Sequence, residues 1–90
     1  PVKEIEDLLL RHPQVMGAAI VGKPDERLGE IGCAFVLPSG DPPTLDSLIE
    51  FLEAQGMTRQ FWPEDIVIVE EFPMTPSGKV QKYKLRQQFL

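Results

Sequence analysis

The sequence predicts a small α+β domain in which two or three helices cover a three-stranded sheet. The 90 residues are enough for one domain and too few for two. Apolar residues recur at helical spacing in three segments, and three other segments are short runs of β-type residues. The predicted element order is therefore α-β-β-α-β-α, which packs as layers of helix and sheet around a modest core.

The first half of the chain is predicted to form a helix and then a β-hairpin. Residues 1–12 carry apolar side chains at helical spacing, at Val2, Ile5, Leu8 and Leu9. Pro13 ends this helix because the residue before a proline is driven out of the α region. Residues 15–21 and 30–37 are predicted strands, and the Gly-Lys-Pro-Asp stretch at 22–25 has the composition of a turn. The two strands are expected to pair as a hairpin whose loop carries Asp25, Glu26 and Arg27.

The second half is predicted to form a helix, a strand and a final basic helix. Thr44 suits the N-cap of the helix, and Gly56 suits the position just after its end. Between them the apolar residues follow the pattern of one helix face, at Leu45, Leu48, Ile49 and Leu52. A third strand is predicted over 65–71 and a loop over 72–78. Residues 79–90 then end in a helix with two apolar residues four positions apart, Leu85 and Phe89.

Charge and hydropathy argue against several classes of protein. No apolar run approaches the ~18 residues of a membrane-spanning helix. All 14 acidic residues lie at or before Glu71, and the basic residues after it fall close together, at Lys79, Lys82, Lys84 and Arg86. An acidic body argues against nucleic-acid binding, which depends on neutralising phosphates. The basic cluster is either a solvated helix face or a surface that meets a small anion such as a nucleotide phosphate.

Cys33 and His12 are predicted to have structural roles. Cys33 is the single cysteine, which excludes an internal disulfide and a four-cysteine zinc site. It lies in the apolar run 31–37, where a small buried side chain is expected, and a reducing, cytoplasmic setting fits. His12 is expected to pack or cap at the helix end rather than act in catalysis. Glu70 and Glu71 are expected to face opposite sides of the third strand, so they would be poor acid–base partners.

The segment most informative about function is 72–80, which reads Phe-Pro-Met-Thr-Pro-Ser-Gly-Lys-Val. It is not a phosphate-binding P-loop, because the first glycine of that motif would fall at Pro73 and Val80 replaces the magnesium-binding Ser or Thr. Two prolines stiffen the approach, and Ser77-Gly78 allows a tight turn that presents Lys79. Lysine is a compact charge on a long stem, suited to reaching an oxyanion, although an exposed loop lysine has the same local sequence.

This segment resembles the C-terminal lysine motif of the adenylate-forming superfamily, roughly Leu-Pro-x-Thr-x-x-Gly-Lys-[Ile/Val]. The superfamily includes acyl- and aryl-CoA synthetases, luciferases and the adenylation domains of peptide synthetases. Further blocks resemble the family in the right order, at 2–13, 18–29, 34–36 and 84–86. The resemblance covers nearly the whole chain and implies the fold of the family's C-terminal subdomain. Residues 1–90 are thus expected to be the mobile C-terminal domain of an acyl-CoA ligase, without its large N-terminal AMP-binding domain.

The resemblance also implies an activity and a role for Lys79. Enzymes of this family join a carboxylic acid to ATP, giving an acyl-adenylate and pyrophosphate, and then pass the acyl group to a thiol, usually that of coenzyme A. ATP with Mg²⁺ and coenzyme A would be bound mainly by the N-terminal domain, which is the expected partner. The small domain swings between two poses. Lys79 matches the adenylation lysine, which bridges the attacking carboxylate and the α-phosphate, and the isolated chain is expected to be inactive.

The further candidate cofactor-binding residues are Ser77, Gly78, Arg59 and Trp62. Many family members carry Tyr/Phe-Lys-x-Pro before the third strand, near the nucleotide of coenzyme A. Here residues 60–63 read Gln-Phe-Trp-Pro, so Phe61 replaces that lysine. Either the rings of Phe61 and Trp62 both pack under the connection, or one of them stacks on adenine while Arg59 meets a phosphate.

Three functions remain open at this point. The leading one is an acyl-CoA ligase domain, and the stretch Lys-Val-Gln-Lys-Tyr-Lys-Leu-Arg at 79–86 resembles that of stand-alone ligases. The second is an adenylation domain that loads a carrier protein. The third, from another class, is a non-catalytic α+β binding module. The acid itself is not specified, because the acyl pocket belongs to the N-terminal domain.

Overall fold

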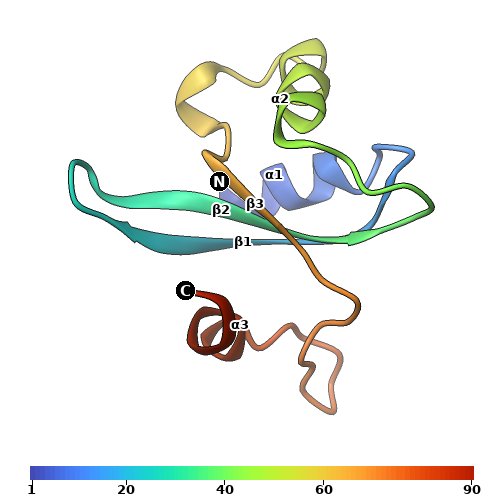
Figure 1. Cartoon of the computed structure of the whole chain (residues 1–90). Helices are drawn as coiled ribbons and strands as arrows, with labels where there is room; N and C mark the ends of the chain where they lie inside the picture. The colour runs from blue at the N-terminus through green and yellow to red at the C-terminus, as the bar shows by residue number, and fades with distance from the viewer.

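The computed structural model describes residues 1–90 as one sheet with helices on both faces (Figure 1). The elements in order are α1 (Val2–Leu9), β1 (Val15–Asp25), β2 (Gly29–Pro38), α2 (Leu45–Ala54), the 3₁₀ helix η1 (Arg59–Phe61), β3 (Asp65–Ile68) and α3 (Lys82–Phe89). The predicted order α-β-β-α-β-α and the α+β class are confirmed. None of the helices has the length and apolar character needed to cross a membrane.

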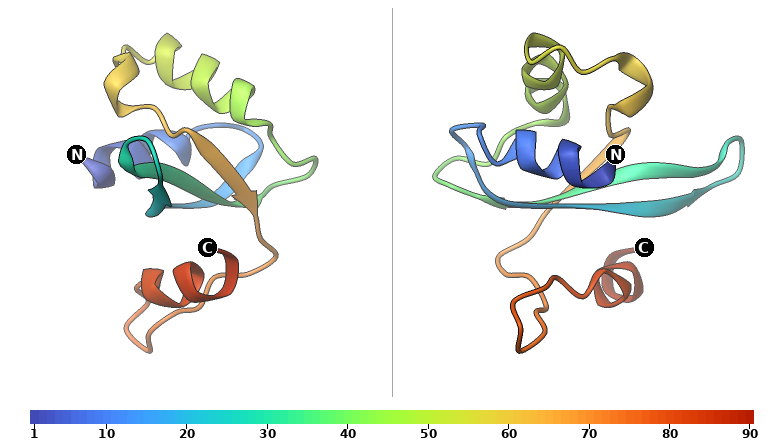
Figure 2. Two further views of the ribbon diagram at one scale, coloured as in Figure 1. Left: turned by 60° about the vertical axis from the view of Figure 1, so that its left-hand side comes forward. Right: turned by 180° about the vertical axis from the view of Figure 1, so that it is seen from behind.

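Strand β2 lies at the centre of the sheet, antiparallel to β1 and parallel to β3. Helices α1 and α2 cover one face and α3 covers the other, as the two views of Figure 2 show. Ala34 and Val36 of β2 belong to the core under α1 and α2, whereas Cys33 and Phe35 belong to the core under α3. A strand buried on both faces has a continuous apolar sequence, which is why residues 31–37 carry so few polar side chains.

Each face of the sheet has its own apolar core. The core on the side of α1 and α2 consists of Ile5, Leu9, Val15, Ala34, Val36, Leu48 and Leu52. The core on the side of α3 consists of Ala19, Val21, Cys33, Phe35, Val69 and Leu85. Leu85 is the one fully buried residue of α3, and Phe89 meets Phe35 edge to face with ring centroids 5.7 Å apart. The two apolar positions predicted for the last helix therefore hold it on the sheet.

The hairpin of β1 and β2 is confirmed and its turn contains Glu26 and Arg27 as predicted, but the turn is shorter than the sequence predicted. Residues 22–25 continue β1 and pair with 29–32 of β2. Pro24 is compatible with this position because β1 is an edge strand, where a missing N–H does not break the sheet. The turn itself is 26–28, and Asp25 Oδ2 accepts hydrogen bonds from the N–H groups of Arg27 and Leu28, at 3.2 and 2.8 Å.

Strand β3 has four residues instead of the predicted seven. Val69 still donates from its N–H to the carbonyl of Val36, at 2.9 Å, and its buried side chain joins the core on the side of α3. The chain then leaves the sheet toward the layer of α3 (Figure 1). Glu70 and Glu71 therefore lie beyond the strand, both exposed, and the prediction that they alternate across it was wrong.

Helix α2 begins and ends as its sequence predicts. Thr44 Oγ1 accepts from the N–H of Ser47, and Ser47 Oγ accepts from the N–H of Thr44, both at 3.1 Å. This reciprocal capping box satisfies two backbone donors at the start of the helix. Gly56 has φ +85°, the left-handed conformation that glycine adopts readily after a helix end. Helix α1 is shorter than predicted, ending at Leu9 rather than at residue 12.

The structural roles predicted for His12 and Cys33 are confirmed. His12 is 8% exposed, its Nδ1 accepts from the N–H of Gln14 at 3.0 Å, and its ring meets Phe51 edge to face at 5.1 Å. Cys33 is a free, fully buried cysteine. Burial raises the pKa of the Cys33 thiol to about 11.

Candidate functional site

Residues 73–81, here called the lysine loop, leave the sheet region and fold back on themselves before entering α3 (Figure 2). The two arms meet at a bridge between Met74 and Val80. Gln81 donates from its N–H to the carbonyl of Pro73, at 2.8 Å. The lysine loop is therefore a small hydrogen-bonded hairpin rather than an irregular connection.

The tip of the lysine loop is a β-turn with Pro76 and Ser77 at its centre. The N–H of Gly78 donates to the carbonyl of Thr75, at 3.0 Å, and Gly78 has φ +91°. Only glycine adopts that conformation without strain. The Thr75 hydroxyl accepts from the N–H of Lys79 and lies within hydrogen-bond distance of the Ser77 hydroxyl, both at 3.0 Å. The tight turn predicted at Ser77-Gly78 is confirmed.

Lys79 combines a fixed backbone with an unpaired side chain. Its N–H and its carbonyl are both bonded to Thr75. Its side chain is exposed, and its ammonium forms none of the ion pairs or hydrogen bonds of the chain. Because the backbone of Lys79 is fixed and its ammonium has no partner, this side chain is suited to bind an anion that arrives from outside the chain.

A groove of about 700 Å³ separates the lysine loop from α1. Its lining includes three lysines, Lys3, Lys79 and Lys82, and two acids, Glu6 and Asp7. Lys82 Nζ lies 2.8 Å from Glu6 Oε2, and Lys3 Nζ lies 3.5 Å from Asp7 Oδ2. Since each acid neutralises one lysine, the uncompensated positive charge of the groove belongs to Lys79.

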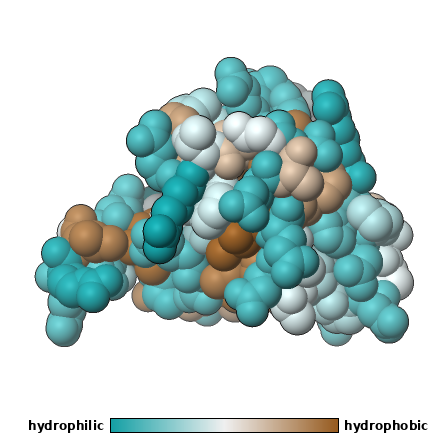
Figure 3. All heavy atoms as spheres, turned by 90° about the horizontal axis from the view of Figure 1, so that it is seen from above, coloured by the Kyte–Doolittle hydropathy of each residue, from teal (hydrophilic) through white to brown (hydrophobic).

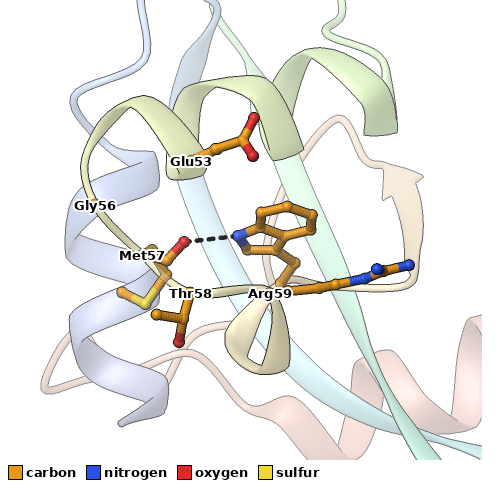
Figure 4. A pocket seen from close by; sticks show the side chains of 6 residues that line it. Glu53, Gly56, Met57, Thr58 and Arg59 are labelled. Atoms are coloured by element: carbon orange, nitrogen blue, oxygen red, sulfur yellow. Dashed lines mark hydrogen bonds between the residues drawn. The ribbon is translucent and has the colours of Figure 1, made fainter.

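A second pocket, of about 450 Å³, lies at the C-terminal end of α2 (Figure 4). Its lining residues are Glu53, Gly56, Met57, Thr58, Arg59 and Trp62. Trp62 Nε1 donates to the carbonyl of Met57, at 2.9 Å. Trp62 and Phe61 are half-buried against the core of α1 and α2, which confirms that the rings pack under the connection. Arg59 is exposed, and its side chain extends away from Met57 (Figure 4).

The structure does not bring all the predicted site residues together. Ser77, Gly78 and Lys79 lie on the lysine loop, whereas Arg59 and Trp62 line the other pocket, and the two cavities have no lining residue in common. The face above α2 is mostly hydrophilic, with hydrophobic side chains in a few small patches (Figure 3). The predicted site residues are thus divided between two separate cavities.

Sequence reasoning missed one residue of the lysine loop, Thr75, and one residue of the groove, Glu6. Thr75 lies inside the lysine motif, and its hydroxyl could have been suspected from the turn chemistry of threonine. Glu6 gave no local signal, because Lys82 and Ile20, its two partners, lie far from it along the chain.

Residues 4–79 match the family of AMP-binding enzyme C-terminal domains. The chain belongs to this family. The matched span ends at Lys79, so the lysine loop as far as this residue lies within the region typical of AMP-binding enzyme C-terminal domains. The resemblance noted in the lysine motif is thereby confirmed over most of the chain.

Known relatives include acyl-CoA ligases and other adenylate-forming enzymes. The chain is 47% identical over 87 residues to the mitochondrial medium-chain acyl-CoA ligase of Mus musculus, covering 94% of this chain and 14% of that protein. It is 39% identical over 85 residues to the salicyl-AMP ligase / salicyl-S-ArCP synthetase of Mycobacterium tuberculosis, covering 94% and 15%. The apo structure of MbtA from Mycobacterium smegmatis superposes with a TM-score of 0.94 at 38% identity, covering 98% and 17%. The chain therefore spans about one sixth of the length of these relatives.

Proposed function

We propose that residues 1–90 are the mobile C-terminal domain of an ATP-dependent acyl-CoA ligase whose large AMP-binding domain lies outside this chain. The full enzyme would convert a carboxylic acid and ATP into an acyl-adenylate and pyrophosphate, and would then transfer the acyl group to coenzyme A. ATP with Mg²⁺ and coenzyme A would be held mainly by the larger domain. Family membership and the likeness to a medium-chain acyl-CoA ligase support this proposal.

The observation that carries the proposal is the state of Lys79, with its backbone bonded on both sides to Thr75 and its ammonium unpaired. In adenylation a carboxylate must approach the α-phosphate, and both groups are anionic. A fixed cation between them lowers this repulsion and stabilises the charge that develops on the phosphate oxygens. Lys79 is suited to this role because the other two lysines of the groove are already paired with acids.

Each remaining candidate residue is assigned to ATP or to coenzyme A according to its position in the domain. Ser77 and Gly78 lie beside Lys79 at the turn and would contact the ATP phosphates with it. Arg59 and Trp62 line the other pocket, where Arg59 would meet a phosphate of coenzyme A in the second pose and Trp62, packed against the core, would form part of the pocket wall. The separation of the two cavities fits a domain that offers a different face to each half-reaction.

A second candidate differs in the acceptor of the acyl group. The likeness to the salicyl-S-ArCP synthetase favours the thiol of a carrier protein over coenzyme A. Supplying the full-length enzyme with preformed acyl-adenylate and either acceptor separates the two, because only the true acceptor is acylated at a substantial rate.

The experiment that tests the proposal compares Lys79→Ala with Lys84→Ala in the full-length enzyme. Lys84 is an exposed lysine of α3 that does not line the groove. Its replacement removes the same charge as Lys79→Ala but leaves the groove unchanged. For Lys79→Ala we expect carboxylate-dependent pyrophosphate exchange to fall by roughly 10²–10³ while thioester formation from preformed acyl-adenylate persists. Equal exchange rates for the two variants would contradict the proposed role of Lys79.

A further inference from the structure

The groove also contains an ion pair between Glu6 and Lys82, which the role proposed for Lys79 does not explain. The side chains of Glu6 and Lys82 are 19% and 38% exposed, whereas those of the neighbouring pair, Lys3 and Asp7, are 86% and 57% exposed. The N–O distance is 2.8 Å for the first pair and 3.5 Å for the second. A short, partly buried pair holds its geometry better than an exposed one.

The Glu6 carboxylate connects three elements through a single oxygen. Oε2 accepts from the N–H of Ile20 at 2.8 Å, and the same oxygen contacts Lys82 Nζ. Ile20 lies on β1, an edge strand, and the carboxylate partners a backbone donor there. One side chain of α1 is therefore attached both to the sheet and to the start of α3.

Lys82 follows the lysine loop directly. Its N–H donates to the carbonyl of Val80 at 3.1 Å, and the preceding residue closes the base of the loop by its bond to Pro73. Fixing the Lys82 side chain on α1 therefore also fixes the arm of the lysine loop that carries Lys79. The paired charges of Lys82 and Glu6 cancel, so Lys82 is poorly suited to bind an anion itself.

We propose that the Glu6–Lys82 pair positions Lys79 for adenylation by holding the lysine loop at a set distance from α1. This inference rests on the function proposed for Lys79. Displacing a catalytic group by about 1 Å costs as much as 10²-fold in rate, so a loosened loop would slow the step that uses Lys79. The thioester-forming step does not use Lys79 and would be spared.

The test uses Glu6→Gln, Lys82→Met and the double variant in the full-length enzyme. Glutamine keeps an oxygen for the Ile20 N–H but loses the charge that holds Lys82, and methionine keeps most of the lysine stem. We expect each single variant to lower the turnover of pyrophosphate exchange by roughly 10- to 100-fold, with thioester formation from preformed acyl-adenylate unchanged. The double variant should be no slower than the slower single variant, because both changes break the same pair.

Two further variants, Lys82→Arg and Lys79→Ala, decide between the positioning role and its alternatives. Lys82→Arg, which can still pair with Glu6, should retain most of the exchange activity. Three results would each overturn the positioning role: losses that add in the double variant, losses that affect both half-reactions together, and an unchanged exchange rate. Lys79→Ala measured alongside separates the two proposals. If it lowers exchange while Glu6→Gln does not, only the positioning role fails; if it has no effect, both proposals fail.

Discussion

The hydroxyl of Thr75 accepts a hydrogen bond from the backbone N–H of Lys79, with Oγ1 and N separated by 3.0 Å. The N–H of Thr75 also donates to the carbonyl of Lys79, at 2.8 Å. The two residues are thus joined at two points across the turn. The backbone of the lysine is set by a residue four positions earlier, while the ammonium at the end of its side chain has no partner.

Replacing Thr75 by valine should therefore slow adenylation without removing the lysine. Valine keeps the branched shape and loses the acceptor for the N–H of Lys79. A hydrogen bond of this kind contributes about 0.5–1.5 kcal/mol, so we expect pyrophosphate exchange by the full-length enzyme to fall roughly 2- to 10-fold. Thr75→Ser keeps the hydroxyl and should stay close to the parent rate. If serine is as slow as valine, the hydroxyl is not the feature that matters.

Gly17 is predicted to be intolerant of a side chain because of Phe72, the residue just before the lysine loop. A Cβ on Gly17 would lie 2.9 Å from Cε2 of Phe72 and 3.3 Å from Cβ of Leu37. Phe72 packs against the core on the side of α3, so it has little room to move. We expect Gly17→Ala to destabilise the 90-residue chain by about 1–3 kcal/mol, a cost typical of overpacking.

Thermal unfolding measures this cost, since each kcal/mol lowers the Tm of a domain of 60–100 residues by about 4–8 °C. Gly22→Ala is the matched control, because the atoms nearest to a Cβ there belong to the carboxyl group of Glu30, whose exposed side chain can rotate away. The control should lose clearly less stability. Equal losses at the two positions would mean that a general preference for glycine in β1, and not the contact with Phe72, sets the cost.

The parts of the fold that the sequence predicted well are those with local causes. Thr44 and Gly56 act within one turn of the helix that they delimit, so reading α2 required no knowledge of the rest of the chain. The prediction of a turn at 22–25, the Gly-Lys-Pro-Asp stretch, was wrong for the opposite reason. Its composition favours a turn, but pairing with 29–32 of β2 decides its conformation.

The same distinction applies to the candidate site. The turn at Ser77-Gly78 and its lysine are encoded within five residues, so they were visible in the sequence. The contact of Glu6 with Lys82 exists only after the sheet has formed, and the same holds for the ion pair of Lys23 with Asp65, which lies outside the site. Neither side chain of either pair is unusual at its position, so no local pattern distinguishes them from other surface charges.

The ion pair of Lys23 and Asp65 should make stability depend on pH in the acid range. The hydrogen bond from Lys23 lowers the pKa of Asp65 below its ordinary value of 3.8. A carboxyl whose pKa is lowered on folding stabilises the fold above its unfolded pKa and loses this effect as the pH falls through the folded value. We therefore expect Asp65→Asn to have a lower Tm than the parent at pH 7.

This difference in Tm should shrink as the pH falls below 3.8 and through the lowered pKa of Asp65. Glu64→Gln provides the control, since Glu64 is an exposed neighbouring acid whose side chain forms no ion pair. Unfolding curves from pH 2 to pH 7 give the comparison. A difference that stays constant down to pH 2 would show that the asparagine acts by packing and not through the charge of Asp65.

Cys33 should be nearly inert toward thiol reagents in the folded chain. Only the thiolate reacts, and burial raises the pKa of Cys33 from 9.0 to about 11, with the negative charge of Asp65 adding to the effect. At pH 8 this shift leaves roughly 100-fold less thiolate than in the unfolded chain. The side chain is also fully buried, so labelling with an aromatic disulfide reagent should be at least that much slower without urea than with it.

The same shift predicts a loss of stability at alkaline pH. Because the pKa of Cys33 is raised on folding, its contribution is complete below pH 9.0 and disappears as the pH rises toward 11. Lys23, whose pKa is raised by its hydrogen bond to Asp65, adds a further loss only above its ordinary value of 10.5. Between pH 9 and 10.5 the decline in Tm therefore reports on Cys33, and Cys33→Ala should flatten it. A parent and variant that decline in parallel there would contradict the raised pKa, even if labelling is slow, because inaccessibility alone would explain the labelling.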